Sequence, residues 1–304
     1  MATASFTKKI IETSITLGKG DFGAVSDFQN TKVISRLRTI VEIEKNGHPS
    51  KNKAKIKIYG MAERDMHVIA HNQFGPRAIR RDLIQLNAGD ETMLHPPKIF
   101  EGEINEAYAS YQSPPNLYLC IEATAGYYPA LAPANPRSLQ GSVSVKDLMN
   151  SYAKQMGYTF EDNGVTARLA NPYFPGSAYQ QASALADAAD IEFGIDDGVL
   201  FIAPRDKPRR GTAPLICALS GMKECPIYEK TGLRIETLFN PAIVLGGLIV
   251  VKSLVFNNNM AETTWRVHGL QHHLESENPG GKWMTNIKAA PLSAPAVDES
   301  GGAE

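Results

Sequence analysis

The sequence has few cysteines and no long apolar run. Its three cysteines, Cys120, Cys217 and Cys225, are widely spaced and odd in number, which excludes a disulfide framework and favours a reducing compartment during assembly. Their isolation also argues against a zinc site. The N-terminus has no apolar core of signal-peptide length, and the longest apolar run, 243–251, contains two glycines and is too short to span a membrane. We therefore expect a soluble protein, made in the cytoplasm, without membrane insertion.

The charge of the chain lacks a dominant sign. Lys and Arg number 31 against 32 for Asp and Glu, whereas broad nonspecific binding of nucleic acid requires clustered positive charge. A neutral or acidic channel through which DNA slides remains compatible with this balance. Apolar residues make up 43% of the 304 residues, which is enough for the cores of two or three folded domains.

One phosphate-binding motif is present without its companions. Residues 17–25 match the glycine-rich loop of protein kinases, G-x-G-x-x-G-x-V. A kinase also needs a His-Arg-Asp catalytic loop and a later Asp-Phe-Gly. Here Arg64-Asp65 lacks the preceding histidine, and the only Asp-Phe-Gly, 21–23, lies inside the loop itself. We interpret this loop as a glycine-rich β-turn that binds no nucleotide.

Other catalytic patterns are also missing. His268 and His272 share one strand face, but their Cα atoms would lie roughly 13 Å apart, so hydrogen-bonded or interface histidines, His273 included, are favoured over a metal site. Asp196-Asp197 and Glu275-Ser-Glu277 are interpreted as turn carboxylates rather than a glycosidase pair. The sequence contains no G-x-S-x-G. We predict no catalytic, cofactor-binding or metal-binding residues, and hence no enzyme.

The first part of the chain has the alternation of β-strands. Leu37, Thr39, Val41 and Ile43 alternate with charged residues, with Ile40 as the one exception. The same period of two recurs over 53–58, and the Asn46-Gly47 turn signal between the two runs indicates a hairpin. A short helix is predicted over 62–72, with Met66, Ile69 and Ala70 on one side. Further strands are expected at 82–88, 98–104 and 116–123. Several short strands with turns between them predict a barrel or sandwich.

The middle of the chain changes character after the Pro-, Ala- and Gly-rich stretch 126–136. Two units of similar order follow, each a helix, a strand, an Asx-Gly turn and a further strand. The first helix is amphipathic and opens on a serine N-cap, Ser144, and the second begins at Ser177. Their helices span 144–157 and 177–190. We expect both helices to pack on a shared sheet, which makes a small α+β insert.

The C-terminal part returns to β-structure. Residues 204–211, with Arg205, Lys207, Arg209 and Arg210, are interpreted as a basic, solvated linker rather than a nucleic-acid contact. Strands are expected over 215–290. Gly269 would suit a β-bulge, because Trp265 and Val267 fall on one face and Leu270 and Leu274 on the other. The last residues, 293–304, have the composition of a disordered tail.

Several short motifs, in this order, resemble the baseplate hub proteins of contractile-tailed bacteriophages. At the C-terminal end they are Thr-Leu-Phe-Asn-Pro (237–241) before a glycine-initiated strand, and His-His-Leu-Glu-Ser (272–276) before Pro-Gly-Gly-Lys-Trp (279–283). Earlier ones are Leu-Arg-Thr (37–39), Ile-Lys-Ile-Tyr-Gly-Met (56–61) and Leu-Asn-Ala-Gly-Asp (86–90). The resemblance covers most of the chain, which is shorter than the larger hubs and lacks their extra domains.

The resemblance implies a mainly β protein with two tail-tube-like β-barrel domains flanking a small α+β domain. We expect the first barrel over 1–125, the insert over 126–204, the second barrel over 205–291 and a disordered tail over 292–304. It further implies a homotrimer whose six barrels form a pseudo-sixfold ring between the tail tube and the central spike, with DNA passing through. The implied partners are a tail tube protein or tube initiator, the central spike protein and neighbouring baseplate wedge proteins. The implied location is the virion baseplate, after assembly in the host cytoplasm.

Two alternatives stay open from the sequence. The same fold could serve as the tail-tip hub of a non-contractile tail or of a phage-like bacteriocin. From another class, a tail-associated cell-wall hydrolase would hide its site in loops, although no carboxylate pair or metal set supports it.

A channel for DNA places a condition on the lysines of 53–58. Fixed positive charge in the channel would hold phosphates, and Lys53, Lys55 and Lys57 share one strand face. We therefore expect that face to point outside or to a subunit interface, where Glu42 and Glu44 would offset it.

Overall fold

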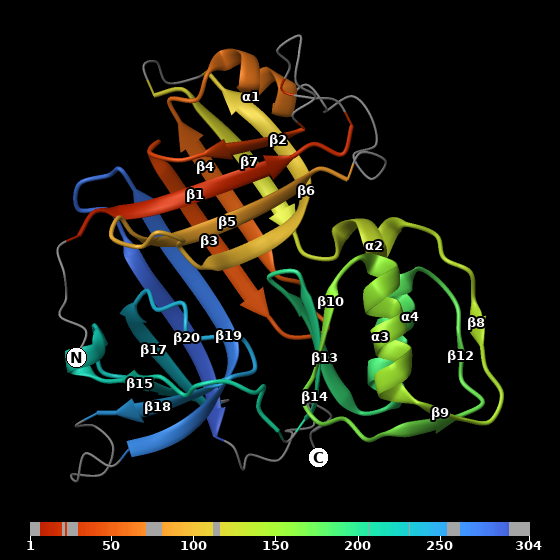
Figure 1. Cartoon of the computed structure of the whole chain (residues 1–304). Coiled ribbons are helices and arrows are strands. Elements are labelled where there is room, and N and C mark those ends of the chain that lie inside the picture. The colour runs from red at the N-terminus through yellow and green to blue at the C-terminus, as the bar shows by residue number, and fades with distance from the viewer. Residues whose placement is uncertain are drawn as a thin grey trace, which may run out of the picture.

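The computed structural model describes residues 7–19, 22, 30–70, 81–111, 116–205, 207–230, 232–253 and 262–291. Most of the glycine-rich loop and the whole tail 292–304 lie outside these residues. The expected mainly β class with a smaller α+β insert is confirmed, and Figure 1 shows two β regions with the insert to one side. Among the described residues, no helix has the length and apolar character needed to cross a membrane.

The first β region contains seven strands and one helix. Strands β1, β5 and β6 lie across β3, β4 and β7 (Figure 1), and the core between them contains Ile15, Val41, Ile56, Leu86 and Ile121. The helix packs Met66 and Ile69 onto this core, on the side predicted. The bounds are β1 (Lys9–Thr16), β2 (Thr31–Ile34), β3 (Thr39–Asn46), β4 (Lys53–Tyr59), α1 (Glu63–Ala70), β5 (Leu83–Asp90), β6 (Lys98–Ser110) and β7 (Tyr118–Thr124).

Alternation explains the β3–β4 hairpin. Val41, Ile43, Ile56 and Ile58 are all fully buried, while the residues between them point outward. The register pairs Thr39 with Ile58, so the predicted hairpin is confirmed.

The second β region contains six strands, which also enclose an apolar core. Its core contains Ile235, Ile249, Val267 and Ile287. The bounds are β15 (Leu215–Ile216), β16 (Ile227–Glu229), β17 (Gly232–Leu238), β18 (Leu248–Lys252), β19 (Glu262–Ser276) and β20 (Trp283–Pro291).

The predicted bulge in β19 is confirmed. The pairing with β20 shifts between Val267 and Gly269, which leaves His268 as the extra residue. Because of this shift, Trp265 and Val267 before the bulge and Leu270 and Leu274 after it are all buried. A bulge thus turns an interrupted apolar pattern into one continuous buried face.

The two β regions share one sheet. Its main path is β16-β17-β20-β19-β3-β4-β7-β6-β5-β1-β2. Off this path β18 pairs with β19 and β15 pairs with β18, which makes 13 strands among the described residues. The connection is the antiparallel pairing of β19 with β3, from Gly269 opposite Asn46 to Ser276 opposite Thr39. Leu274 of β19 packs into the core of the first region. The sequence did not predict this pairing.

The insert is a three-stranded sheet with two helices packed beside it. The sheet order is β10-β14-β13, and Tyr152, Leu185, Phe193 and Leu200 share its buried core. Both helices begin at the predicted serines: Ser144 accepts from the backbone N of Asp147, and Ser177 forms a capping box. The bounds are α2 (Tyr127–Leu131), β8 (Arg137–Ser138), β9 (Ser142–Ser144), α3 (Val145–Met156), β10 (Thr159–Asp162), β11 (Arg168–Ala170), β12 (Tyr173–Phe174), α4 (Ala178–Ala188), β13 (Ile191–Asp196) and β14 (Val199–Pro204).

One detail of the insert differs from the expected repeat. The strand after the Asp162 turn, β11, pairs with β9 and not with the shared sheet. The domain boundaries at residues 125, 204 and 291 remain a prediction.

Candidate functional site

The outward face of the shared sheet is polar and carries both signs of charge. Glu42 lies opposite Lys55 and Glu44 opposite Lys53, so the expected cross-strand partners of these lysines are confirmed. On the other side Lys55 forms a 2.7 Å ion pair with Glu122. Across the strands from β17 to β6, outward charged residues of both signs occur in similar number, among them Lys53, Lys55, Lys57, Arg234 and Lys288 and, of the opposite sign, Glu42, Glu44, Glu106, Glu122, Glu236 and Glu275.

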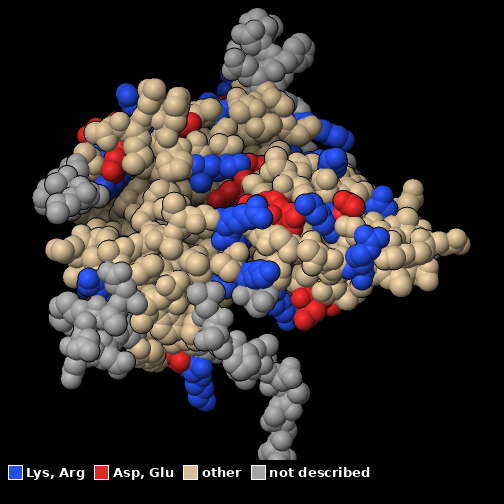
Figure 2. Space-filling model, turned by 60° about the horizontal axis from the view of Figure 1, so that its bottom comes forward, with Lys and Arg blue, Asp and Glu red and all other residues tan. Residues whose placement is uncertain are grey.

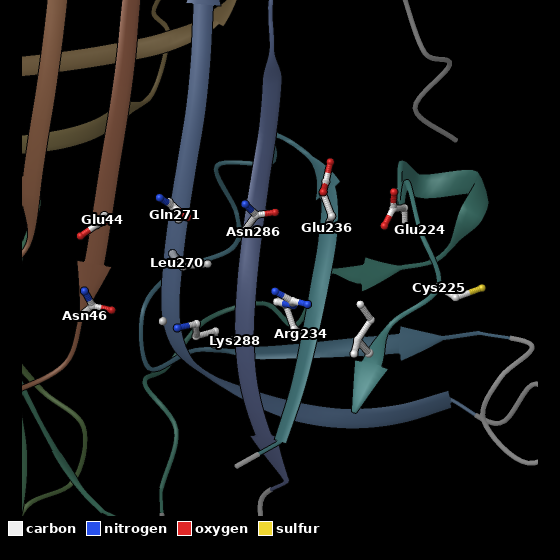
Figure 3. A pocket seen from close by; sticks show the side chains of 12 residues that line it. Glu44, Asn46, Glu224, Cys225, Arg234, Glu236, Leu270, Gln271, Asn286 and Lys288 are labelled. Atoms are coloured by element: carbon white, nitrogen blue, oxygen red, sulfur yellow. The ribbon is translucent and has the colours of Figure 1, made fainter. Parts of the chain in front are cut away.

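These side chains form rows that cross the strands. One row contains Glu236, Asn286, Gln271, Glu44 and Lys53, which are successive partners in the registers of β17, β20, β19, β3 and β4. Figure 3 shows its first four members on neighbouring strands. The row crosses from the second β region to the first without a break, because β19 pairs directly with β3.

A hollow of about 540 Å³ lies on this face, and the segment that carries Glu224 and Cys225 borders it at one side (Figure 3). Its lining combines amides with charges of both signs, including Gln271, Arg234 and Lys288. This is the lining of a hydrated surface, and among its described residues we find no nucleophile held beside a base.

The histidines of β19 do not meet. His272 is buried, its Nδ1 lies 2.8 Å from the Thr285 hydroxyl, and burial lowers its pKa to about 3. His268 is exposed at the bulge and His273 points to the other side from His272. The interpretation of His272 as a hydrogen-bonded strand histidine is confirmed. Within the described ranges, no three His, Cys, Asp or Glu side chains are placed to hold a metal.

The second notable site is a buried charged cluster where the insert meets both β regions. Lys45 of β3, with 5% of its side chain exposed, lies 2.8 Å from Asp196 and 2.7 Å from Asp197 of the β13–β14 turn. Arg209 lies 2.9 Å from the other oxygen of Asp196 and pairs with both oxygens of Glu161. We call Lys45, Asp196, Asp197, Arg209 and Glu161 the junction cluster.

The junction cluster ties three parts of the chain together. Arg209 also donates to the carbonyl of Leu245, in the second β region, at 3.1 Å, and lies 4.2 Å from the ring centre of Phe201. From the first region, Asn52 donates to the carbonyl of Ile195 and to Asp196.

This cluster corrects two expectations from the sequence. The segment 204–211 is not simply a solvated linker, because Arg209 is 9% exposed and fully engaged. Asp196 and Asp197 do lie at a turn, but both are ion-pair partners, Asp196 fully buried and Asp197 half-buried. The available signal was Lys45, which continues the buried alternation of Val41 and Ile43 and so required a buried carboxylate.

The pKa values of Asp196 and Asp197 are shifted in opposite directions. Burial alone would raise the pKa of Asp196, but Lys45 and Arg209 outweigh it and hold that pKa below its usual range. Burial raises the pKa of Asp197 to about 6, opposed mainly by Lys45. One carboxylate therefore stabilises the folded junction as an anion, while the other favours the protonated form.

A second contact lies on the other side of the junction. Glu103 of β6 accepts from the hydroxyl of Tyr158 at 2.9 Å and from the backbone N of Tyr127 at 3.0 Å, and burial raises its pKa. Lys51 donates to the carbonyl of Gly126 and lies over the ring of Tyr179. The insert is therefore held to the β body by polar contacts on two sides.

Comparison with known proteins identifies the family. The family model described as baseplate hub gp41 matches residues 10–280. The chain belongs to this baseplate hub family. The resemblance seen in the sequence is thus confirmed, and the protein is a phage tail structural component. No curated protein sequence matches the chain significantly.

Solved structures share its fold at low identity. A tail protein from Neisseria meningitidis MC58 is 9% identical, with a TM-score of 0.60, over 92% of this chain and 96% of that one. The 43 kDa tail protein of prophage MuSo2 from Shewanella oneidensis is 10% identical, with a TM-score of 0.58, over 93% and 98%. The E. coli c3393 protein, a type VI secretion component described as structurally similar to T4 tail proteins gp27 and gp5, is 9% identical, with a TM-score of 0.57, over 84% and 73%.

Proposed function

We propose that the chain forms a homotrimeric ring in the baseplate that joins the tail tube to the central spike and lets DNA pass. The observation that carries this proposal is the β3–β19 pairing. It makes the two β regions of one chain consecutive parts of a single curved sheet. Three copies would present six such regions, and so match a threefold spike to a sixfold tube.

The polar sheet face supports a further part of the proposal. The sequence-based expectation placed the lysine face away from the channel because its positive charge would hold phosphates. The register places carboxylates on both sides of Lys55 and on one side of Lys53, so the face is not strongly basic. On this ground we propose instead that the balanced face, from β17 to β6, lines the channel, because it would hold few phosphates.

On the molecular surface shown in Figure 2, basic and acidic side chains are likewise interspersed in one band.

The partners proposed for the ring are a tube protein or tube initiator, the spike protein and neighbouring wedge proteins. Its proposed place is the virion baseplate of a contractile tail, after assembly in the host cytoplasm. The proposed role is structural, without enzymatic activity and without a cofactor.

Sedimentation equilibrium tests the ring. We expect a particle of three 33.1 kDa chains, alone or together with the spike protein. A monomer at all concentrations, even with the spike protein present, would overturn the trimer.

The alternatives have their own tests. Neighbouring genes for a sheath and a spike separate a contractile tail from a tail tip or a bacteriocin. Release of soluble fragments from purified cell walls would favour a hydrolase, whereas we expect none.

A further inference from the structure

The tip of the β13–β14 hairpin lies against β3 and β6 of the first β region. Asp197 and Gly198 form its two-residue turn, with φ of 52° and 82°, the conformation that favours an Asp-Gly pair. A Cβ at Gly198 would lie 2.8 Å from a carboxylate oxygen of Glu101 on β6. The end of the Glu101 side chain could move aside, so it is mainly the positive φ of Gly198 that favours glycine at this position.

The charges around this turn do not balance. Lys45 and Arg209 face three carboxylates, those of Asp196, Asp197 and Glu161. The neighbouring Lys98 and Glu101 on β6 form a 2.7 Å pair with each other, and Lys98 also acts to lower the pKa of Asp197. His272 of β19 is held neutral by burial, which lowers its pKa to about 3.

The surplus negative charge lies on Asp197. Its Oδ2 contacts Lys45, but its Oδ1 is buried with no hydrogen-bond partner in the described structure. Asp196, in contrast, has partners for both oxygens. A buried anionic oxygen without a donor is costly, and a proton lowers that cost because a neutral carboxyl group is less costly to bury than a carboxylate.

We propose that the β13–β14 hairpin is an acid-strengthened latch, which docks the insert more tightly on the β body when Asp197 takes up a proton. The latch is a property of a single chain and does not depend on the proposed ring.

The sign follows from proton linkage. Burial raises the pKa of Asp197 from its ordinary 3.8 to about 6, so the docked state binds this proton more tightly than an undocked, hydrated state does. Docking is therefore strongest at mildly acidic pH and weakens as pH rises through 6. Asp196 and Glu161 have lowered pKa values, so their contributions disappear only at more acidic pH. The tightening is confined to the interval between.

Three other titratable groups of the described residues make contacts elsewhere on the same junction. His48 Nε2 is 3.1 Å from Asp187 of α4, and Glu103 lies at the second contact, with its pKa raised by burial. Glu192 of β13 forms an ion pair with Arg266 of β19. The experiment must separate them from Asp197.

Hydrogen–deuterium exchange of the intact chain tests the latch at pH 5.0 and 7.5, after correction for intrinsic exchange rates. Peptides over 191–204 report on the hairpin, and peptides from β4 and β7 serve as internal reference. In the unaltered protein we expect the protection of the hairpin to fall by up to about tenfold from pH 5.0 to 7.5, the change that a pKa shift from 3.8 to about 6 produces.

Asp197→Asn removes the titrating group. Its hairpin should stay protected at pH 7.5 and lose most of the pH dependence. Asp190→Asn is the matched control, since Asp190 also has a positive φ, of 49°, but its side chain is 83% exposed; it should behave as the unaltered protein. His48→Gln and Glu103→Gln should each leave most of the effect.

Two results would overturn the latch. One is full pH dependence retained in Asp197→Asn. The other is protection in the unaltered protein that does not change, or rises, between pH 5.0 and 7.5.

Discussion

The chain joins its parts in two different ways. The two β regions are joined by backbone pairing of β3 with β19 and by Leu274 entering the first core, so this joint depends on register and apolar packing. The insert is joined through buried side-chain charges, above all Lys45, Asp196 and Arg209. The stability of the β3–β19 joint should not depend on pH, because backbone hydrogen bonds and apolar contacts form it. The stability of the joint with the insert should depend on pH, because ionised side chains form it. The proposed ring would need the first joint to be rigid, but it places no such demand on the charged joint that holds the insert.

Breaking the charged joint should have the largest effect. Arg209→Met leaves Asp196 short of a partner and Glu161 without its cation, and we expect a loss of about 3–5 kcal/mol in the free energy of unfolding. Chemical denaturation measures it. Arg210→Met is the matched control, because that side chain is exposed, and it should change stability by less than about 0.5 kcal/mol. Equal losses in both variants would contradict the junction cluster.

Breaking the apolar joint should rank next. Leu274→Ala removes a fully buried side chain that β19 contributes to the first core, and we expect a loss of about 2–4 kcal/mol. Unlike the loss in Arg209→Met, this loss should stay the same from pH 5 to 7.5. Denaturation curves at both pH values test this, and a strong pH dependence would remove the distinction between the joints.

Gly198→Ala sharpens the comparison at the hairpin tip. The new Cβ would meet the carboxylate of Glu101 and take a strained φ of 82°, so we expect a loss of about 1–2 kcal/mol. Gly164→Ala is the control within the insert, since its φ is also positive but no atom lies within 4 Å of the new Cβ. Thermal unfolding should show the larger loss for Gly198→Ala. The reverse order would mean that the tip is not tightly docked.

The polar face should contribute least to stability. Lys55 and Glu122 are 46% and 40% exposed, so Lys55→Ala is expected to cost less than about 1 kcal/mol. Denaturation at low and high salt checks this. A larger loss that persists in high salt would show that the pair acts as more than a surface contact.

The sequence predicted the local features well. Alternation in 39–46 and 53–59 gave the hairpin, serines gave both helix starts, and the misphased apolar residues around Gly269 gave the bulge. These features depend on residues close together in the chain. The β3–β19 pairing joins residues more than 200 positions apart, and periodicity shows which face of a strand is buried but not which strand lies beside it.

The junction cluster was missed for a related reason. Asp196-Asp197-Gly198 has the chemistry of a turn, and 204–211 has that of a linker, so each segment was explained by itself. Only the fold shows that Lys45 and Arg209 close on the same turn. The local sign was Lys45, a lysine at a buried position of the β3 alternation, which needed a carboxylate from elsewhere in the chain as its partner.

Electron cryo-microscopy of the assembled particle tests the central claim most directly. The account predicts a ring of three chains, with the continuous face from β17 to β6 lining the bore. Lys53, Lys55 and Lys57 would lie within the bore, Lys53 opposite Glu44 and Lys55 between Glu42 and Glu122. A ring whose bore is lined by another surface, with these lysines on the outside, would contradict the account.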